Sequence, residues 1–373
     1  MIRLSKSVVG EKEAAAVSKV LKEDGYLGMG KTVQKFELEI ENYLSAKTNT
    51  CCCVNSGTSA LQLAVESVTN PGDHVLVPSF TYVATYQAIS AAGCIPISCD
   101  VLEDSFLLDL NDVKKRIDSR CKALIYVHYA SNPGNLDELY SFGKSNNLRI
   151  IEDAAHSFGC SYKEKKIGSF GDITCFSFDG IKNITSGEGG AILTEDQEVL
   201  SFARDARLLG VIKDTDKRYL GERSWNFDVK KQGYRFHMSN IFAAIGLVQL
   251  DRLKEEFTQK RIKLKELYLK LLSNNSTLTF QKTNVNSYII PHIMPERIGG
   301  NKRDKIFNEL KENNIGVGLH YKPNHLLSFY KNKTSLKITE ILYREIISLP
   351  LHPDLSEDDV KRISQIINKS ISI

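Results

Sequence analysis

Short apolar runs alternate with amphipathic stretches from about residue 47 to residue 193. Such runs, bounded by turn residues and separated by helical patterns, are typical of crossover units in a mostly parallel α/β sheet. Helices are expected at Ser59–Val68 and at Leu136–Asn146, which carries acidic residues in its first turn. The expected strands are Cys51–Asn55, His74–Val77, Ile95–Cys99, Ala123–His128, Arg149–Glu152, Ile173–Ser177 and Ala191–Thr194.

The pattern changes in the second half of the chain. Ala203–Asp228 is rich in charge and lacks strong periodicity, which predicts a loop or an active-site flap. Asn240–Leu272 keeps apolar residues at helical spacing and is long enough to link two domains. Beyond it we expect a strand at Ser287–Met294 and helices at Arg303–Asn313 and Ser356–Ile367, which together indicate a smaller α+β domain.

The 373 residues therefore predict a large domain over residues 1–250, with an N-terminal arm, and a small C-terminal domain over residues 251–373. A hydrophobic content of 42% is enough to build large cores. The 49 basic and 45 acidic side chains are mixed along the chain, so nucleic-acid binding is not expected. No secretory signal or apolar span is present, so we expect a cytoplasmic protein without a membrane partner.

The cysteines lie in the first half of the chain, mostly among apolar neighbours. No C-x-x-C pair occurs, and the run Cys51-Cys52-Cys53 would point successive side chains to opposite faces of a strand, which suits no tetrahedral metal site. We therefore expect reduced core cysteines and no metal.

Two charged residues follow predicted strands in this α/β setting. Asp153 ends one strand, and Lys182 lies between another strand and the glycine-rich run Gly187–Gly190. A lysine amine can hold the aldehyde of pyridoxal phosphate as a Schiff base, and an aspartate can keep the pyridine nitrogen protonated. A lone loop lysine is usually a solvated surface group, and Asp153 alone would fit a helix N-cap. The combination favours a pyridoxal phosphate enzyme, specifically a transaminase.

The turn Asn55-Ser56-Gly57-Thr58-Ser59 offers a site for the phosphate of that cofactor. Gly57 lets the backbone approach closely, and free N–H groups at the start of the next helix, with the hydroxyls of Thr58 and Ser59, suit a dianion. Serine and threonine are also ordinary N-cap residues, so the turn is informative only together with the lysine and aspartate.

Two aromatic residues could lie beside the cofactor ring. Tyr82 follows a predicted strand and could stack on the pyridine face, although a core tyrosine is the alternative. His156, three residues after Asp153, could pack beside the phenolic oxygen of the ring.

The order of these motifs resembles the DegT/DnrJ/EryC1/StrS nucleotide-sugar aminotransferases, which have the pyridoxal-phosphate-dependent type I aminotransferase fold. The resemblance covers nearly the whole chain. It rests on Gly25–Gly30 with Phe36-Glu37, Asn55–Thr58, Pro78–Thr81, Glu152–His156, Gly168–Asp172, the lysine segment and Leu349–Pro353.

The resemblance implies a role for each residue around the ring. Lys182 would be the catalytic lysine that carries the cofactor, and Asp153 would be the partner of the pyridine nitrogen. Tyr82 and His156 would flank the ring. During turnover the released Lys182 amine would shuttle a proton between substrate and cofactor carbons, because desolvation lowers its pKa.

The phosphate would be bound by Gly57, Thr58 and Ser177. The family's active sites lie at a homodimer interface, and Asn240 matches the asparagine that reaches the cofactor phosphate of the neighbouring subunit. The resemblance therefore implies a homodimer with shared active sites.

The implied reaction is ping-pong, with L-glutamate as amino donor and a nucleotide-diphosphate keto sugar as acceptor. The segment Lys182–Gly190 resembles members that aminate carbon 4 of a nucleotide-linked 4-keto-6-deoxy sugar, which we favour over amination of carbon 3. The product would be a 4-amino-4,6-dideoxy sugar for surface polysaccharide such as O-antigen, or for a related glycoconjugate. The carrier, dTDP, UDP or GDP, stays open.

Substrate contacts are expected from two segments. Asp179-Gly180 stands where relatives commonly carry His-Pro or Tyr-Pro, and Asp179 is expected to touch the sugar. His320, Tyr321 and Lys322 lie where relatives place groups near the nucleotide, so they could face the diphosphate, with a structural turn as the alternative. His237 also departs from the more usual arginine.

Two other functions remain as alternatives. A sugar dehydratase of the same fold typically replaces the lysine with histidine, so Lys182 argues against it. A cofactor-binding regulator without catalytic activity would usually carry an added DNA-binding or sensor module, for which this chain has no spare length.

Overall fold

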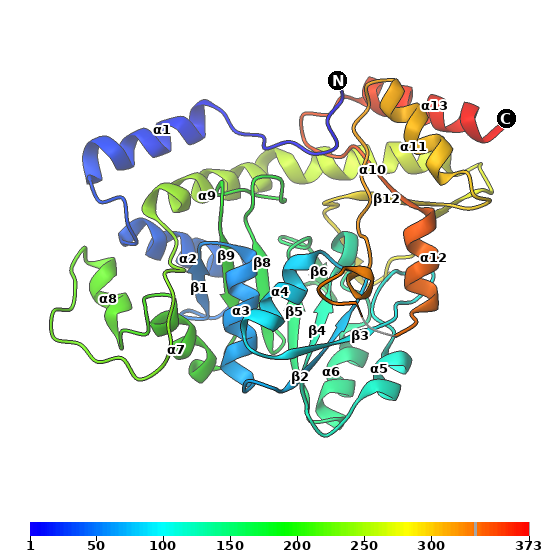
Figure 1. Ribbon diagram of the computed structural model, residues 1–373. Helices are drawn as coiled ribbons and strands as arrows, with labels where there is room; N and C mark the ends of the chain where they lie inside the picture. The colour runs from blue at the N-terminus through cyan, green and yellow to red at the C-terminus, as the bar shows by residue number, and fades with distance from the viewer. Residues whose placement is uncertain (332–333, 373) are drawn as a thin grey trace.

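The computed structural model describes residues 1–331 and 334–372. A twisted sheet lies at the centre of the molecule, and a long helix crosses above it (Figure 1). In spatial order the strands of the large sheet are β1 (Cys51–Val54), β9 (Gly190–Leu193), β8 (Ile173–Ser177), β5 (Arg149–Asp153), β4 (Cys121–Val127), β2 (His74–Pro78) and β3 (Ile95–Cys99).

Of these strands only β9 runs against the others, because it pairs antiparallel with both β1 and β8. Helices cover both faces, as a parallel sheet with crossover connections requires. One face is covered by α3 (Gly57–Val68), α4 (Val83–Ala91) and α7 (Gln197–Ala206). The other is covered by α2 (Lys31–Leu44), α5 (Leu110–Arg116), α6 (Leu136–Ser145) and α9 (Asn240–Arg252).

The three adjacent cysteines of β1 illustrate this double burial. Cys51 and Cys53 belong to the core on one face of the sheet, and Cys52 belongs to the core on the other. Each of the eight cysteines is a buried free thiol, which confirms the expectation of core cysteines.

The last third of the chain forms its own core. Its sheet contains β10 (Leu278–Phe280), β12 (Met294–Ile298) and β13 (Ile346–Leu349). The helices of this region are α10 (Thr258–Leu272), α11 (Arg303–Glu312), α12 (Lys337–Glu345) and α13 (Glu357–Ser372). The N-terminal residues of the chain pack against this C-terminal region (Figure 1), where Ile2 forms a parallel bridge with Ile315.

The remaining elements are short or peripheral, and α1 packs along α9 (Figure 1). They are α1 (Glu11–Lys19), α8 (Asp214–Tyr219), the π-helical turns η1 (Val20–Asp24) and η3 (Leu253–Phe257), the 3₁₀ turns η2 (Tyr129–Ser131) and η4 (Asn324–Leu326), and a small sheet of β11 (Ser287–Tyr288), β6 (Ser161–Tyr162) and β7 (Lys165–Lys166).

The expected strands of the large sheet are confirmed within two residues at their ends. The long helix over 240–272 is confirmed, with α9 and α10 joined by the π-helical turn η3. The division into domains at residue 250 stays a prediction, and that point falls inside α9. None of the helices within residues 1–331 and 334–372 is both long and apolar enough to span a membrane.

Two expectations were wrong. The segment Ala203–Asp228 is not a continuous loop, because it begins inside α7 and contains α8, whose Arg218 Nε donates to Asp214 Oδ2 at 2.6 Å. Ser287–Met294 is not one strand, because β11 pairs with β6 and β12 begins only at Met294. Pro291 lies between them and has no N–H for a ladder.

Candidate active site

A cavity of about 310 Å³ opens beside the carboxyl ends of β5 and β8. Ligands of open α/β sheets bind at this edge of the strands. Of the predicted site residues, the walls of the cavity bring together Gly57, Thr58, Tyr82, Asp153, His156, Ser177, Asp179, Lys182, His320 and Tyr321.

Asp153 ends β5 and is 6% exposed. Its Oδ2 accepts a hydrogen bond of 2.8 Å from Thr85 Oγ1, and its Oδ1 accepts one of 3.3 Å from the N–H of Ala155. Burial raises the pKa of this carboxyl, and the bond from Thr85 opposes that shift. No ion pair joins Asp153 to a cation within the part of the chain that the structure describes, so a cationic ligand group would find a ready partner there.

Lys182 lies between β8 and β9 and is half-buried. Burial lowers the pKa of its amine, while the negative charges of Asp153 and Asp179 act in the opposite direction. A larger fraction of the amine is therefore neutral near pH 7 than for a solvated lysine. The two charged residues predicted from sequence thus interact across one cavity.

The backbone around Lys182 is held from several sides. Its N–H donates to Asp179 O at 3.1 Å, and its carbonyl accepts from Arg261 Nη2 at 3.5 Å. The neighbouring Asn183 side chain donates to Phe158 O and Ile290 O. These hydrogen bonds fix the backbone position from which the Lys182 side chain extends.

The start of α3 forms a polar cradle against Ser177. A Cβ on Gly57 would lie 2.7 Å from Ser177 Cβ, so only glycine permits this approach. Ser56 caps the helix by accepting from Ser59 N. Among residues 1–331 and 334–372, none accepts a hydrogen bond from the N–H of Gly57 or Thr58. These donors at a helix N-terminus suit a phosphate.

The Ser59 hydroxyl is not part of this cradle, contrary to the sequence-based expectation. It donates to Asn55 Oδ1 at 2.6 Å and lies 2.8 Å from Ser56 Oγ. Ser59 therefore completes the capping arrangement, which uses the hydroxyl that a phosphate would need.

His156 and Tyr321 form the wall near the lysine. His156 Nδ1 accepts from the N–H of Ala130 at 3.3 Å, so the proton of the neutral ring lies on Nε2. His156 Nε2 lies 3.0 Å from Tyr321 Oη and donates to it. Burial lowers the pKa of His156 well below its usual value, and the charge of Lys182 adds to the effect. The imidazole is neutral at pH 7.

His320 and Tyr82 complete the wall. His320 Nδ1 lies 2.7 Å from Ser348 Oγ, and its carbonyl accepts from Tyr129 Oη at 2.5 Å. Burial lowers the pKa of His320 to about 4. Tyr82 is 58% exposed, with its ring centroid 5.6 Å from that of Tyr321. Tyr82 is therefore positioned at the mouth of the cavity.

Two predicted site residues lie outside the cavity. Lys322 is exposed and is not part of its wall, so the expected contact with a diphosphate finds no support in the chain's geometry. Asn240 is buried at the start of α9. Its Oδ1 accepts from the N–H groups of Gly30 and Val33, and its Nδ2 donates to Tyr26 O.

Asn240 therefore holds the turn before α2 within its own chain. Contact between Asn240 and the cofactor of a partner stays a prediction, and these hydrogen bonds oppose it.

Sequence reasoning missed Thr85, Glu188 and Arg261. The Oγ1 atom of Thr85, which holds Asp153, also lies 3.0 Å from Oγ1 of Thr81, which precedes α4, and the Thr-x-x-x-Thr spacing was a visible signal. Glu188 was visible in the glycine-rich run and lines the cavity beside Asp179. Arg261 is fully buried and comes from α10, so no local motif could have linked it to Lys182.

Comparison with known proteins decides the family. Residues 8–368 match the DegT/DnrJ/EryC1/StrS aminotransferase family. The chain belongs to this family. It is 33% identical to the UDP-4-amino-4-deoxy-L-arabinose–oxoglutarate aminotransferase of Shewanella sediminis, over 99% of this chain and 97% of that protein. It is 31% identical to the spore coat polysaccharide biosynthesis protein SpsC of Bacillus subtilis, over 96% and 94% of the two chains.

The fold agrees with this membership. Spr1654 of Streptococcus pneumoniae, solved in PMP and PLP forms, superposes in the PMP form with a TM-score of 0.91 at 28% identity, covering 100% of this chain and 99% of that chain. The protein is therefore a sugar aminotransferase of the DegT/DnrJ/EryC1/StrS family. It has the expected aminotransferase fold, depends on pyridoxal phosphate, and uses a sugar nucleotide and an amino donor as substrates.

The cavity of this aminotransferase fits the cofactor. The N–H groups of Gly57 and Thr58 with the Ser177 hydroxyl would hold the phosphate. Asp153 would receive the pyridinium, and Lys182 would form the covalent link.

Proposed function

We propose that this aminotransferase transfers an amino group from L-glutamate to carbon 4 of a nucleotide-linked 4-keto-6-deoxy sugar. The single observation that carries the proposal is that three groups line the same cavity. They are the buried Asp153 carboxylate, the Lys182 amine and the N-terminus of α3. One cavity of about 310 Å³ favours donor and acceptor entering in turn, as in a ping-pong reaction.

Lys182 moves the proton in this proposal. When bound, pyridoxal phosphate supplies the carbonyl carbon that takes the amino group and a ring that withdraws electrons. The lowered pKa of Lys182 makes a larger fraction of Nζ neutral near pH 7 than for a solvated lysine. In the donor half-reaction this Nζ would accept the proton from the donor's α-carbon and deliver it to the cofactor carbon, and in the acceptor half-reaction it would move a proton from the cofactor carbon to the sugar carbon.

Asp153, His156 and Thr85 set the electrostatics around that step. The Asp153 carboxylate, fixed by Thr85, holds a positive charge on the ring nitrogen. Neutral His156 contributes hydrogen bonds without adding charge, because its Nε2–H is directed to Tyr321 Oη. The wall would therefore stabilise a positive charge at the ring nitrogen through Asp153, and it orients Tyr321 through His156.

The choice of carbon 4 and of glutamate is supported by the relatives. The matching protein of Shewanella sediminis is named for a 4-amino-4-deoxy sugar and for oxoglutarate, the keto acid formed from glutamate. SpsC is named for spore coat polysaccharide biosynthesis, and PseC of Helicobacter pylori is described as an aminotransferase in the biosynthesis of pseudoaminic acid. We place the product in surface polysaccharide or related glycoconjugate synthesis.

We assign the sugar contacts to Asp179, His320 and Tyr321. Asp179 accepts from the N–H of Ile181 through one oxygen, so the carboxylate is fixed in direction. A fixed carboxylate at the cavity wall can accept hydrogen bonds from sugar hydroxyls. His320 and Tyr321 lie on the facing segment, where they would meet the sugar or the first phosphate of its carrier.

A homodimer with shared active sites belongs to the same proposal. Between α8 and α9, Leu220, Trp225 and Phe227 are 77%, 87% and 56% exposed. Large apolar side chains gathered on one segment suit a protein interface. Because Trp225 is the only tryptophan, its fluorescence should shift to shorter wavelength when subunits associate. A protein that sediments as a monomer at every concentration, and whose emission wavelength does not change with concentration, would contradict the homodimer.

A pair of half-reactions tests the function. L-Glutamate should convert the pyridoxal form of the purified enzyme to the pyridoxamine form, seen in visible absorbance, and one of a panel of dTDP-, UDP- and GDP-linked 4-keto sugars should restore it. Restoration by a 3-keto sugar alone would reject carbon 4. A spectrum unchanged by every amino acid and keto sugar would reject transamination.

A further inference from the structure

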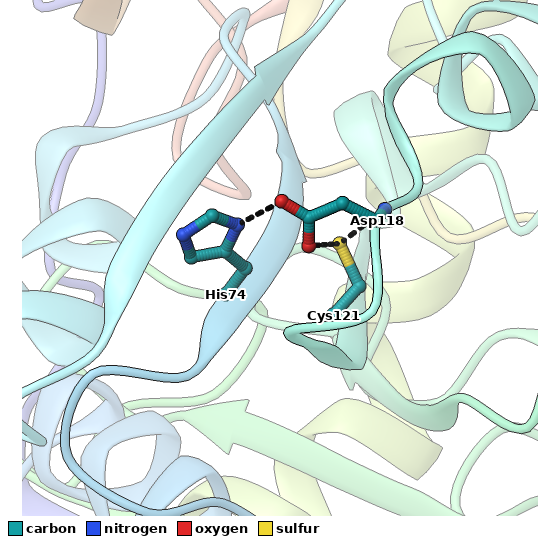
Figure 2. Close-up of side chains that lie close together, drawn as sticks. All are labelled: His74, Asp118 and Cys121. Atoms are coloured by element: carbon teal, nitrogen blue, oxygen red, sulfur yellow. Dashed lines mark hydrogen bonds and ion pairs between the residues drawn. The ribbon is translucent and has the colours of Figure 1, made fainter.

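A group of potential metal ligands lies at the edge of the sheet opposite the catalytic cavity. His74 is the first residue of β2, and Cys121 is the first residue of β4, directly opposite in the strand register. Asp118 lies in the turn that precedes β4. Figure 2 shows the three side chains directed toward one another. The cavity, in contrast, is at the carboxyl ends of the strands.

The donor atoms are close enough to share one ion. His74 Nδ1 lies 3.0 Å from Asp118 Oδ2, and Cys121 Sγ lies 3.4 Å from Asp118 Oδ1. All three ligand atoms fall within 4.8 Å of one another. Bond lengths of about 2.0–2.3 Å to imidazole, carboxylate and thiolate place tetrahedral zinc ligands at similar separations.

The imidazole is aimed at the carboxylate of the cluster. His74 is 5% exposed, and its buried Nδ1 lies 3.0 Å from Asp118 Oδ2, so the two groups already contact each other (Figure 2). Buried polar atoms normally have a hydrogen-bond partner. Asp118 is that partner here, and an ion bound between the imidazole nitrogen and the carboxylate would take the place of their direct contact.

We propose that His74, Asp118 and Cys121 bind one zinc ion, with water as the fourth ligand. Imidazole nitrogen, carboxylate oxygen and thiolate sulfur are the ligand types that zinc takes together. The Asp118 side chain is 42% exposed, which leaves access for the ion and the water. Binding forms the zinc–sulfur bond as the thiol proton leaves to solvent, with no change of oxidation state.

The turn between the ligands is already ordered. Asp118 Oδ1 accepts from the N–H of Arg120 at 2.9 Å, and the N–H of Asp118 is directed to Cys121 Sγ at 3.4 Å. The N–H of His74 donates to Arg120 O at 2.9 Å, which ties β2 to the same turn. Hydrogen bonds to ligands orient them. The ion would fasten the starts of β2 and β4 without touching the catalytic wall.

Zinc binding to the cofactor-loaded enzyme tests this site. After chelator treatment, titration with zinc chloride should give one ion per chain by calorimetry and by metal analysis. Cys121→Ser and His74→Gln should each weaken binding by at least about 10-fold. Cys94→Ser provides the matched control, because Cys94 is another buried thiol but lies outside the cluster. Its affinity should equal that of the wild type.

Asp118→Asn provides a variant on an exposed turn should the buried substitutions fail to fold. It should also weaken zinc binding. Cobalt in place of zinc should give the long-wavelength bands of a tetrahedral thiolate site in the wild type and in Cys94→Ser, and lose them in Cys121→Ser. Absence of tight zinc binding by the wild type, or equal zinc affinity in all four variants, would overturn the proposal.

Discussion

Two groups of buried charges in this enzyme differ in how completely they are satisfied. Glu37 and Arg207 form a closed group beneath β1, whereas Asp153 and Lys182 face a cavity. Glu37 Oε1 accepts from Arg207 Nη1 and from Cys53 N, both at 2.7 Å, and Tyr219 Oη donates to Glu37 Oε2. Arg207 Nη1 also donates to Cys53 O at 2.6 Å.

The charged groups at the cavity have fewer hydrogen-bond and ion-pair partners. Among the residues that the structure describes, Asp153 accepts hydrogen bonds only from the Thr85 hydroxyl and one N–H, and Lys182 contributes charge from across the cavity. Burying charge without a full set of partners is costly, so a fold retains it where a ligand completes the arrangement. In these two groups, the charges with close partners stabilise the fold, while Asp153 and Lys182 face the cavity in which the chemistry is proposed.

The largest expected effect comes from Lys182→Ala. Removing the amine should lower turnover by about 10⁴-fold, the upper range for loss of a general acid–base group, and abolish covalent attachment of the cofactor. Turnover and the visible absorbance of the bound cofactor measure both. Lys322→Ala is the control, since Lys322 is exposed outside the cavity and its loss should change neither. A Lys182→Ala enzyme with near-normal turnover would be incompatible with this assignment.

Glu37→Gln tests the closed group. Loss of the negative charge leaves the buried Arg207 guanidinium unpaired, which should lower the free energy of unfolding by about 3 kcal/mol. Denaturant unfolding measures the change. The folded fraction should keep its cofactor absorbance and turnover, because Glu37 does not line the cavity. A Glu37→Gln variant with an unchanged free energy of unfolding but a lowered turnover would contradict the assignment of Glu37 to stability.

Asp153→Asn should have the opposite character. The variant removes the counter-charge for the ring nitrogen while leaving an oxygen for Thr85, so turnover should fall by about 10²-fold with little loss of stability. Steady-state kinetics and thermal unfolding separate the two. A large drop in stability with unchanged turnover of the folded enzyme would place Asp153 among the structural charges.

The smallest effect is a change in titration. Asp179→Asn removes a negative charge that raises the pKa of Lys182, so that pKa should fall further below its usual value. In cofactor-free enzyme, the pH profile of Lys182 modification by an amine reagent should move to lower pH, because the neutral amine persists there. Asp354→Asn, at an ion pair with Lys6 outside the cavity, should leave the profile in place. A shift to higher pH in Asp179→Asn would contradict the electrostatic account.

The sequence was sufficient to predict the large sheet and the main members of the site. Apart from the edge strand β3, the strands are buried on both faces, as β8 shows with Ile173 in the core on one face and Phe176 in the core on the other. Asp153 and Lys182 were found because each follows a strand, and strand ends at one edge of a parallel sheet converge.

Other features depend on contacts that no local pattern encodes. Tyr321 reaches His156 from a distant segment, and the buried Arg261 of α10 reaches the Lys182 carbonyl. The sequence suggested that Asn240 contacts the cofactor of a neighbouring subunit, yet its amide forms hydrogen bonds within its own chain. The split of Ser287–Met294 followed from pairing of β11 with the hairpin formed by β6 and β7, which periodicity cannot show.

The most direct test of the account is to locate the cofactor on the chain. Borohydride reduction of the loaded enzyme makes the link to lysine permanent, and peptide mass spectrometry then identifies the modified residue. The account predicts a pyridoxyl group on Lys182 and its loss in Lys182→Ala. A label on another lysine, or no label on a folded enzyme saturated with pyridoxal phosphate, would contradict the conclusion that the incompletely satisfied charges mark the catalytic site.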